Sequence, residues 1–350
     1  MLPAHAVVEG LHKLARGWQP SADEGPGALV PQQVWTAAVR RLADDLLGTT
    51  PWPGPEVLTP YQAQTRELLL AMSADASPVR EWDRQLVCVV GCGRSGTTWL
   101  ERMLMSAPET GGVDGAESRL FALAHPLWLL REQVAPLADL PRLVAALRRF
   151  YGTVLAEAMD LHSPDATCFV EKTPRHSLQL AHISACFPDV RVVHVVRDGR
   201  DVARSMSEID FFGVPDPADA MRIWRRVLRD VRRDSAQLAH FREVRYEQLL
   251  ADPVRECGDL LRWIGVPVDG CVEAELDRRA SHRVSTHAGT GHAVGAESWR
   301  TLSRRTLARL YGEGGTVLRR EGYATRAEVC RAALRPSYWG RLAVRYRAAL

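Results

Sequence analysis

The sequence predicts an α/β fold in which helices cover both faces of a parallel β-sheet. Short apolar runs at residues 86–90, 167–170 and 190–196 have the composition of buried strands. Amphipathic stretches with helical spacing separate these runs, and such alternation is typical of parallel sheets. A polar or glycine-rich turn follows each run directly. Because ligands of these folds bind beyond the carboxyl ends of the strands, the turns are the candidate functional site.

The composition is that of a globular protein and favours no nucleic-acid partner. The 350 residues are 46% apolar and 25% charged, with a net charge of +3. No apolar run reaches the roughly 18 residues of a membrane-spanning helix, and the first residues lack the features of a signal peptide. The seven cysteines form no Cys-x-x-Cys pair, which argues against a disulfide framework or a zinc site. We therefore expect a cytoplasmic protein that binds no metal; its oligomeric state stays open.

Three parts follow one another along the chain. The first is a helical extension, with a helix over 34–46, a proline-rich break over 49–60 and a second helix over 61–72. This extension carries no chemical motif and is either a cap over an acceptor site or a packing element. The three expected parts are the extension at 1–80, the sheet domain at 81–325 and a basic helical tail at 326–350.

Hydrophobic periodicity predicts the other elements of the sheet domain. A fourth strand is expected over 244–246, and a glycine- and histidine-rich loop over 281–297. The expected helices span 97–104, 140–161, 177–187, 202–207, 218–240, 248–250, 254–264 and 302–320.

The first strand leads into a glycine turn and then into a helix that begins at Thr97. A strand, a glycine turn and a helix N-terminus bind anions, because backbone N–H groups then point into one concavity. Gly91 and Gly96 have the spacing of a nucleotide P-loop, but Thr97 stands where a P-loop has lysine. The turn therefore suits a single phosphate group, with Arg94 as a clamp and the hydroxyls of Thr97 and Thr98 as donors.

Lys172 stands at the end of the second strand, in the sequence Glu-Lys-Thr-Pro. It is one of only two lysines among 45 basic residues. A compact ammonium cannot be replaced by a planar guanidinium without moving the charge. A lysine retained in so arginine-rich a chain is therefore a candidate catalytic cation, the alternative being a surface ion pair with Glu171.

The glycine turn resembles the 5′-phosphosulfate loop of sulfotransferases that use 3′-phosphoadenosine 5′-phosphosulfate (PAPS). Arg197 follows the third strand, and Ser205 lies eight residues later. This pair is similar to the motif that holds the 3′-phosphate in the same family. The resemblance covers about residues 85–323 and implies a P-loop-like sulfotransferase fold. The residues implied for the 5′-phosphosulfate loop are Arg94, Ser95, Gly96, Thr97 and Thr98.

Three further segments resemble nucleotide-binding parts of that family. Trp99 matches a tryptophan that stacks on adenine, although a core tryptophan is the alternative at this helical position. Tyr246 lies in a segment similar to the family's Tyr-Glu-Asp-Leu, whose tyrosine touches the nucleotide. Trp299 and Arg300 resemble the late basic segment that closes over the 3′-phosphate.

The resemblance also suggests which residues do the chemistry. Lys172 matches the family's lysine at the bridging oxygen of the leaving group. Cytosolic sulfotransferases read Lys-Thr-His and use that histidine as the base, but this chain has Pro174 there. Glu117-Ser118-Arg119 resembles the Glu-Thr-Arg of tyrosylprotein and heparan-type enzymes, although two residues further from the loop. Glu117 is therefore the expected base and His176 the alternative.

The implied reaction moves a sulfuryl group from PAPS to a hydroxyl or amine and releases 3′-phosphoadenosine 5′-phosphate (PAP), without a metal. The acceptor is a small molecule, glycan, lipid or natural product that the sequence does not identify. Two other hypotheses are a small-molecule kinase with a degenerate P-loop and a PAP-binding protein without activity. Residues 335–350 alternate aromatic and basic side chains, which indicates either a membrane-surface helix or a packed terminal helix.

Overall fold

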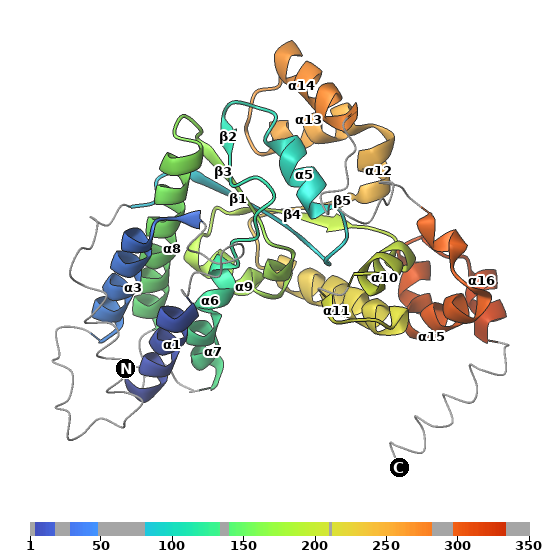
Figure 1. Ribbon diagram of the computed structural model, residues 1–350, viewed down its shortest axis with the longest axis horizontal. Coiled ribbons are helices and arrows are strands. Elements are labelled where there is room, and N and C mark those ends of the chain that lie inside the picture. Colours follow the sequence, from blue (N-terminus) through green and yellow to red (C-terminus); the bar gives the residue numbers. More distant parts are fainter. Residues whose placement is uncertain are drawn as a thin grey trace.

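The computed structural model confirms the α/β fold, with a five-stranded parallel sheet in the order β2-β3-β1-β4-β5 (Figure 1). The structure describes residues 4–17, 29–47, 81–133, 140–209, 212–281 and 297–333. The strands are β1 (Gln85–Gly91), β2 (Thr110–Gly111), β3 (Cys168–Lys172), β4 (Arg191–Val196) and β5 (His240–Arg245). Strand β1 lies at the centre, so the loops after β3, β1 and β4 meet at one edge.

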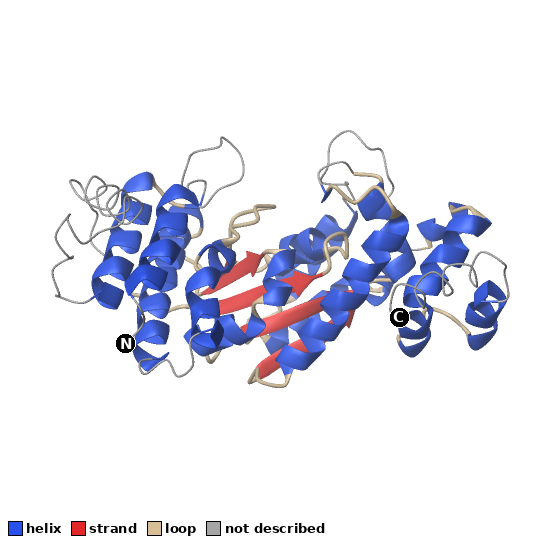
Figure 2. Ribbon diagram, turned by 90° about the horizontal axis from the view of Figure 1, so that it is seen from below, coloured by secondary structure: helices blue, strands red, loops and turns tan. Residues whose placement is uncertain are grey.

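Helices cover both faces of the sheet (Figure 2). One face carries α5 (Thr97–Leu104), α12 (Tyr246–Ala251), α13 (Pro253–Trp263) and α14 (Gly270–Ser281). The other face carries α8 (Leu140–His162), α9 (Leu180–Cys186), α10 (Gly199–Ser207) and α11 (Pro217–Ser235). The remaining helices are α1 (Ala4–Gly17), α3 (Gln32–Leu47), α6 (Leu120–Leu123), α7 (His125–Gln133), η1 (Pro174–Leu178), η3 (Ser298–Thr301), α15 (Arg304–Arg320) and α16 (Arg326–Ala333).

Strand alternation divides the interior into two cores. Successive side chains of a strand point to opposite faces of a sheet. Leu86, Cys88 and Val90 accordingly pack with the helices of the α8 face, whereas Val87 and Val89 pack with those of the α5 face. The same alternation holds in β3, where Phe169 belongs to the first core and Val170 to the second. It fixes the face on which each polar residue at a strand end lies.

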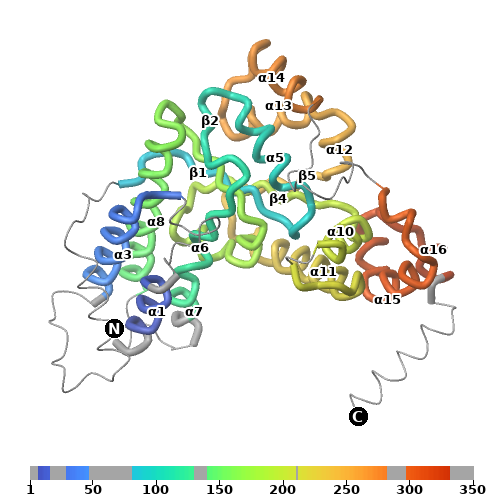
Figure 3. The backbone as a smooth tube through the Cα atoms, viewed as in Figure 1, coloured from blue at the N-terminus to red at the C-terminus, as the bar shows by residue number. Residues whose placement is uncertain are grey.

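Helices α1 and α3 share the core of the α8 face. Trp35 of α3 is fully buried and meets Phe150 of α8 edge to face, with 5.3 Å between ring centroids. These N-terminal helices and the C-terminal helices α15 and α16 lie at opposite ends of the molecule (Figure 3). None of the described helices is long and apolar enough to cross a membrane. The predicted helix over 61–72, most of the loop over 281–297 and the segment 335–350 lie outside the described residues.

Several boundaries differ from the sequence prediction. The helix expected over 218–240 ends at Ser235, and His240 instead begins β5, where it pairs with Arg191 of β4. Strand β3 continues through Lys172, and α10 begins at Gly199, where the Asp198 carboxylate caps the helix by accepting from the N–H of Arg200. The short strand β2 was not expected.

Candidate active site

Four polar segments meet at the carboxyl edge of the sheet. They are the glycine turn after Gly91 of β1, Lys172 at the end of β3, Arg197 directly after β4 and Tyr246 directly after β5. The register places these ends side by side, since Val89 pairs with Lys172 and Gly91 with Val195. Parallel folds bind ligands at this edge.

The glycine turn has the backbone of a tight anion-binding loop. Arg94 and Gly96 both have positive φ angles, 73° and 95°, and Gly96 caps helix α5. A Cβ at Gly96 would lie 2.4 Å from the ring of Tyr246, so only glycine fits there. The buried hydroxyl oxygen of Ser95 has no hydrogen-bond partner among the described residues, so it is available to a ligand. Burial raises the pKa of the neighbouring Cys92 thiol to about 12, so this cysteine is a small buried side chain rather than a reactive thiolate.

Two guanidinium groups converge beside this turn. Arg94 donates from Nε to the hydroxyl of Ser205 at 3.0 Å, and Arg197 donates from Nη1 to the carbonyl of Arg94 at 3.0 Å. The Arg197 guanidinium also lies 4.7 Å from the centre of the Tyr246 ring. Desolvation and the adjacent charge of Arg197 lower the pKa of Arg94. An anion bound here would relieve that repulsion, so the donor set fits a phosphate group.

Asp201 holds the distant segment 297–299 against α10, the helix that carries Ser205. Its buried carboxylate accepts hydrogen bonds from the backbone N–H groups of Glu297 and Trp299, both at 2.8 Å, and from the Ser298 hydroxyl at 2.7 Å. The Trp299 ring lies 3.6 Å under the Arg200 guanidinium. The structure thus brings Trp299 to the helix that carries Ser205.

Arg300 and Trp99 differ in their surroundings. Arg300 pairs with Glu297 at 2.6 Å, and both side chains are exposed. Trp99 is half-buried against the core of the α5 face and meets the Tyr246 ring edge to face at 6.5 Å. Thr97 is buried and Thr98 half-buried at the start of α5.

Lys172 and Glu117 lie together at the end of β3. The Lys172 ammonium is 3.8 Å from a Glu117 carboxylate oxygen and donates to the carbonyl of Gly115 at 3.3 Å. Lys172 is only 2% exposed, whereas the Glu117 side chain is 39% exposed. A buried cation therefore lies beside a carboxylate that solvent can reach. The alternative of a surface ion pair between Lys172 and Glu171 is therefore wrong, because both side chains are buried and Lys172 lies beside Glu117.

His176 lies on the other face of β3. Its Nδ1 is 2.8 Å from the Glu171 carboxylate, which also accepts from the hydroxyls of Ser118 and Thr173 at 2.7 Å each. Although burial alone would raise the pKa of Glu171, His176 and these hydroxyls lower it. Residues 171 and 172 point to opposite faces of the strand. His176 is fully buried, on the face opposite Lys172.

Glu101 is a residue of this region that the sequence analysis missed. It lies on α5 one turn after Thr97 and is 1% exposed. Burial raises the pKa of its carboxyl group to about 9, although the nearby Lys172 ammonium opposes this shift. The sequence did contain a signal for it, because Glu101 is a charged residue on the apolar face of the predicted helix, between Leu100 and Met103.

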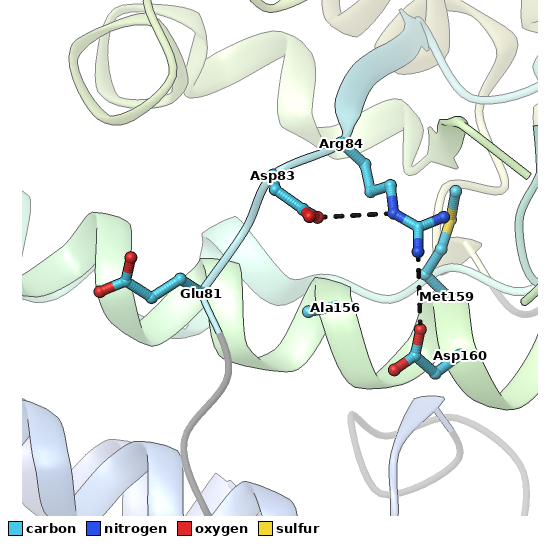
Figure 4. A pocket seen from close by; sticks show the side chains of 6 residues that line it. All are labelled: Glu81, Asp83, Arg84, Ala156, Met159 and Asp160. Carbon is cyan, nitrogen blue, oxygen red and sulfur yellow. Dashed lines mark ion pairs between the residues drawn. The ribbon is translucent and has the colours of Figure 1, made fainter.

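A cavity of about 180 Å³ lies at the opposite end of β1 (Figure 4). Arg84, which directly precedes the strand, pairs there with Asp83 and with Asp160 of α8. This cavity is separated from the glycine turn by the length of β1, and it does not belong to the site at the carboxyl edge.

Comparisons with known proteins identify the family of the chain. The model of the sulfotransferase family matches residues 87–270. A zebrafish (Danio rerio) protein named protein-tyrosine sulfotransferase 1 is 27% identical over 203 residues, which are 54% of this chain and 56% of that protein. The chain thus matches only about half the length of this curated relative.

A structure search also matches this chain to solved structures of sulfotransferases. A sulfotransferase domain from the Synechococcus olefin synthase is 16% identical, with a TM-score of 0.46, over 73% of this chain and 95% of that one. A sulfotransferase from Mycobacterium avium is 15% identical, with a TM-score of 0.43, over 91% of this chain and 97% of that one. Since the family model matches more than half of the 350 residues, the chain belongs to the sulfotransferase family.

Proposed function

We propose that the protein transfers the sulfuryl group of PAPS to a hydroxyl or amine of an acceptor and releases PAP. The observation that carries this proposal is the buried Lys172 ammonium, 3.8 Å from the accessible Glu117 carboxylate. A cation and a base side by side, next to an anion-binding turn, are what sulfuryl transfer requires. Membership of the sulfotransferase family supports the same reaction.

Two single-anion sites would hold the donor. The glycine turn, with the Ser95 hydroxyl and the helix N-terminus at Thr97, suits the 5′-phosphosulfate. Arg197 and Ser205 suit the 3′-phosphate, with Arg94 between the two sites. Thr97 replaces the lysine that a nucleotide P-loop uses for β- and γ-phosphates, so we expect PAP to bind without magnesium. The same substitution disfavours the kinase hypothesis.

The chemistry is an in-line displacement at sulfur. Glu117 accepts the proton of the acceptor hydroxyl, whose oxygen forms the new bond to sulfur. The bond between sulfur and the bridging oxygen breaks, and its electron pair leaves with PAP. Lys172 stabilises the negative charge that grows on that bridging oxygen. Positioning and charge neutralisation supply most of the catalysis, as in phosphoryl transfer.

Glu117 is a better base than His176 because of accessibility. A general base must come within hydrogen-bond reach of the proton that it removes. His176 is fully buried, and its Nδ1 is engaged with Glu171 on the other side of the strand. Glu117 is partly exposed and lies next to Lys172.

The acceptor class stays broad in this proposal. A phenolic hydroxyl is the first candidate, because the zebrafish relative is named a protein-tyrosine sulfotransferase. Sugars, lipids and other small molecules are the other candidates, and the N-terminal extension at 1–80 is a candidate cap over the acceptor. We place the reaction in the cytoplasm.

The test supplies PAPS carrying labelled sulfate to the full chain, with a tyrosine peptide, p-nitrophenol, glucose and dodecanol as acceptors. Labelled product from at least one acceptor, together with PAP binding in EDTA, is the expected result. Lys172→Ala and Lys172→Arg should keep PAP affinity within about threefold and lose about 100- to 1,000-fold in turnover. Stabilisation by magnesium and ATP but not by PAP would instead favour the kinase. PAP binding without transfer to any acceptor, water included, would favour the inactive PAP-binding protein.

A further inference from the structure

The residue that follows Glu117 is hydrogen-bonded to the residue that precedes Lys172. The Ser118 hydroxyl donates to the Glu171 carboxylate at 2.7 Å, and both side chains are buried. The Lys172 ammonium lies 3.8 Å from the Glu117 carboxylate. Because neighbouring side chains of a strand point to opposite faces, these two contacts lie on opposite sides of β3. The loop that carries Glu117 is therefore attached to the end of β3 at two adjacent positions.

Thr173 adds a second hydrogen-bonded link between the loop and β3. Its hydroxyl donates to the same Glu171 oxygen, Oε1, at 2.7 Å and accepts from the backbone N–H of Arg119 at 3.3 Å. The Ser118 hydroxyl likewise accepts from the N–H of Leu120, at 3.2 Å. A hydroxyl has only one proton, so donation to Glu171 leaves the lone pairs of both hydroxyls to accept from the loop backbone. One carboxylate oxygen thus orients the acceptors of two consecutive loop N–H groups.

Arg119 has a backbone conformation that needs such support. Its φ is 51°, in the left-handed region that residues other than glycine rarely adopt. Such a conformation persists where the surrounding structure determines it. Arg119 is the N-cap of α6, whose Phe121 ring meets the His176 ring edge to face at 5.0 Å. His176 in turn lies 2.8 Å from the second Glu171 oxygen. Contacts of Glu171 therefore support the chain on both sides of Arg119.

We propose that Glu171 is a positioning residue that holds the Glu117 loop on β3 and thereby fixes the base beside Lys172. This inference rests on the proposed sulfuryl transfer. Glu171 is 2% exposed and lies on the face of β3 opposite Lys172, so it acts through the loop and does not touch the reacting groups. Sites on strands are more precise than sites on loops. The network around Glu171 attaches a catalytic loop residue to a strand.

Substitutions of Glu171 separate its acceptor oxygen from its charge. Glu171→Gln keeps a carbonyl oxygen for the two hydroxyls, so kcat should stay within about threefold of the wild type. Glu171→Ala removes that oxygen and should lower kcat about 10- to 100-fold, because small misplacements of reacting groups are costly. The KM for PAPS and the PAP dissociation constant should stay unchanged in both variants. Val170→Ala, buried in the same strand, is the matched control: it should lower the melting temperature with little change in kcat.

Ser118 provides a milder test that does not depend on the folding of Glu171→Ala. Ser118→Ala removes one link and should lower kcat about tenfold, whereas Ser118→Thr keeps the hydroxyl and should stay within about threefold of the wild type. If Ser118 acts through Glu117, adding Ser118→Ala to Glu117→Gln should cost no more than about threefold beyond Glu117→Gln alone. Fully multiplicative losses, or a Ser118→Thr variant as impaired as Ser118→Ala, would overturn the proposal.

Hydrogen exchange tests the same contacts without any activity. The N–H groups of Arg119 and Leu120 should lose protection in Glu171→Ala, although both acceptor hydroxyls are still present, and keep it in Glu171→Gln and Val170→Ala. Unchanged protection in Glu171→Ala would refute the role of Glu171 even if the wild-type protein transfers sulfate. An inactive wild-type protein with the expected exchange pattern would instead refute the proposed function alone.

Discussion

The Nε of Arg94 donates a hydrogen bond to the Oγ of Ser205 at 3.0 Å, although the two residues are 111 positions apart. Arg94 belongs to the glycine turn after β1, and Ser205 belongs to α10 after β4. The bond therefore joins the two predicted phosphate sites into one surface. Arg197 also donates to the Arg94 carbonyl. A phosphate group bound at one site would therefore lie next to the other site.

Arg197→Ala should separate the two phosphate sites in a binding experiment. We expect it to weaken PAP about 10- to 100-fold, the usual effect of removing a hydrogen bond to a charged group. Adenosine 5′-phosphosulfate lacks the 3′-phosphate and should lose much less affinity. Calorimetry with both ligands measures the difference. Arg226→Ala, on the exposed face of α11, is the control and should change neither affinity. Equal weakening of both ligands would remove Arg197 from the 3′-phosphate site.

Substituting each of the two candidate bases should have opposite effects on turnover and stability. Glu117→Gln should keep PAP affinity and the melting temperature but lose about 100- to 10,000-fold in turnover. His176→Ala should keep most turnover but cost about 1–3 kcal/mol of unfolding free energy, because the buried Glu171 carboxylate loses a partner. Steady-state rates and thermal melts of both variants measure this.

Asp114→Asn is the matched control for Glu117→Gln, since it removes an acid three positions earlier in the same loop. Its exposed pair with Arg102 contributes little, so turnover should stay within about threefold. Near-normal turnover in Glu117→Gln, with activity abolished in His176→Ala, would assign the base to His176.

Gly96→Ala should remove PAP binding, whereas Gly265→Ala should affect only stability. Both glycines have positive φ angles, 95° and 85°. A methyl group at Gly265 meets nothing within 4 Å, so this variant should lose only the roughly 1–2 kcal/mol of left-handed strain. The methyl at Gly96 would also push against Tyr246 beside the donor site. Equal PAP affinity in the two variants, measured by calorimetry, would contradict this.

The stability of the fold should fall in acid partly through Glu243 of β5. Burial would raise the pKa of Glu243, but hydrogen bonds from His194 and Arg232 lower it to about 2, from an ordinary 4.5. A carboxylate with a lowered pKa in the folded state contributes its full stabilisation above its unfolded pKa. That contribution is lost as the pH falls from about 4.5 through 2.

Glu243→Gln should therefore have a lower melting temperature at neutral pH and a smaller decrease between pH 4.5 and 2 than the wild type. Asp83→Asn, whose side chain is 81% exposed, is the control and should follow the wild-type curve. Parallel curves for Glu243→Gln and the wild type would show that this carboxylate contributes nothing to the acid sensitivity.

Strands β1 and β4 and the turns that follow them could be predicted because they depend on local sequence. The valine-rich run before Gly91 and the run before Arg197 form β1 and β4 within one or two residues of the expected bounds. Helix α11 was expected to continue to residue 240, because residues 236–239 favour a helix. Its end depends on β5 pairing with β4, which the sequence does not display.

The candidate anion site could be proposed from residue types, and Glu117 from the family resemblance, but the contacts around these residues could not be predicted. Asp201 accepts three hydrogen bonds from residues 96 to 98 positions away. The buried Glu101 of α5 interacts electrostatically with Lys172 at the end of β3. Such contacts arise only when distant elements pack together, and no spacing rule reports them. The surroundings of both residues are visible only in the folded chain.

The packing of α3 on α8 shows that the family match and the hydrophobic core have different limits. The family match covers residues 87–270, whereas the hydrophobic core also includes residues of α1 and α3. Helix α8 lies inside that stretch, while Trp35, which fills the surface around Phe150, lies outside it. A chain cut to residues 87–270 would expose the aromatic surface around Phe150 to water, so we expect it to be less stable than a chain that keeps α3.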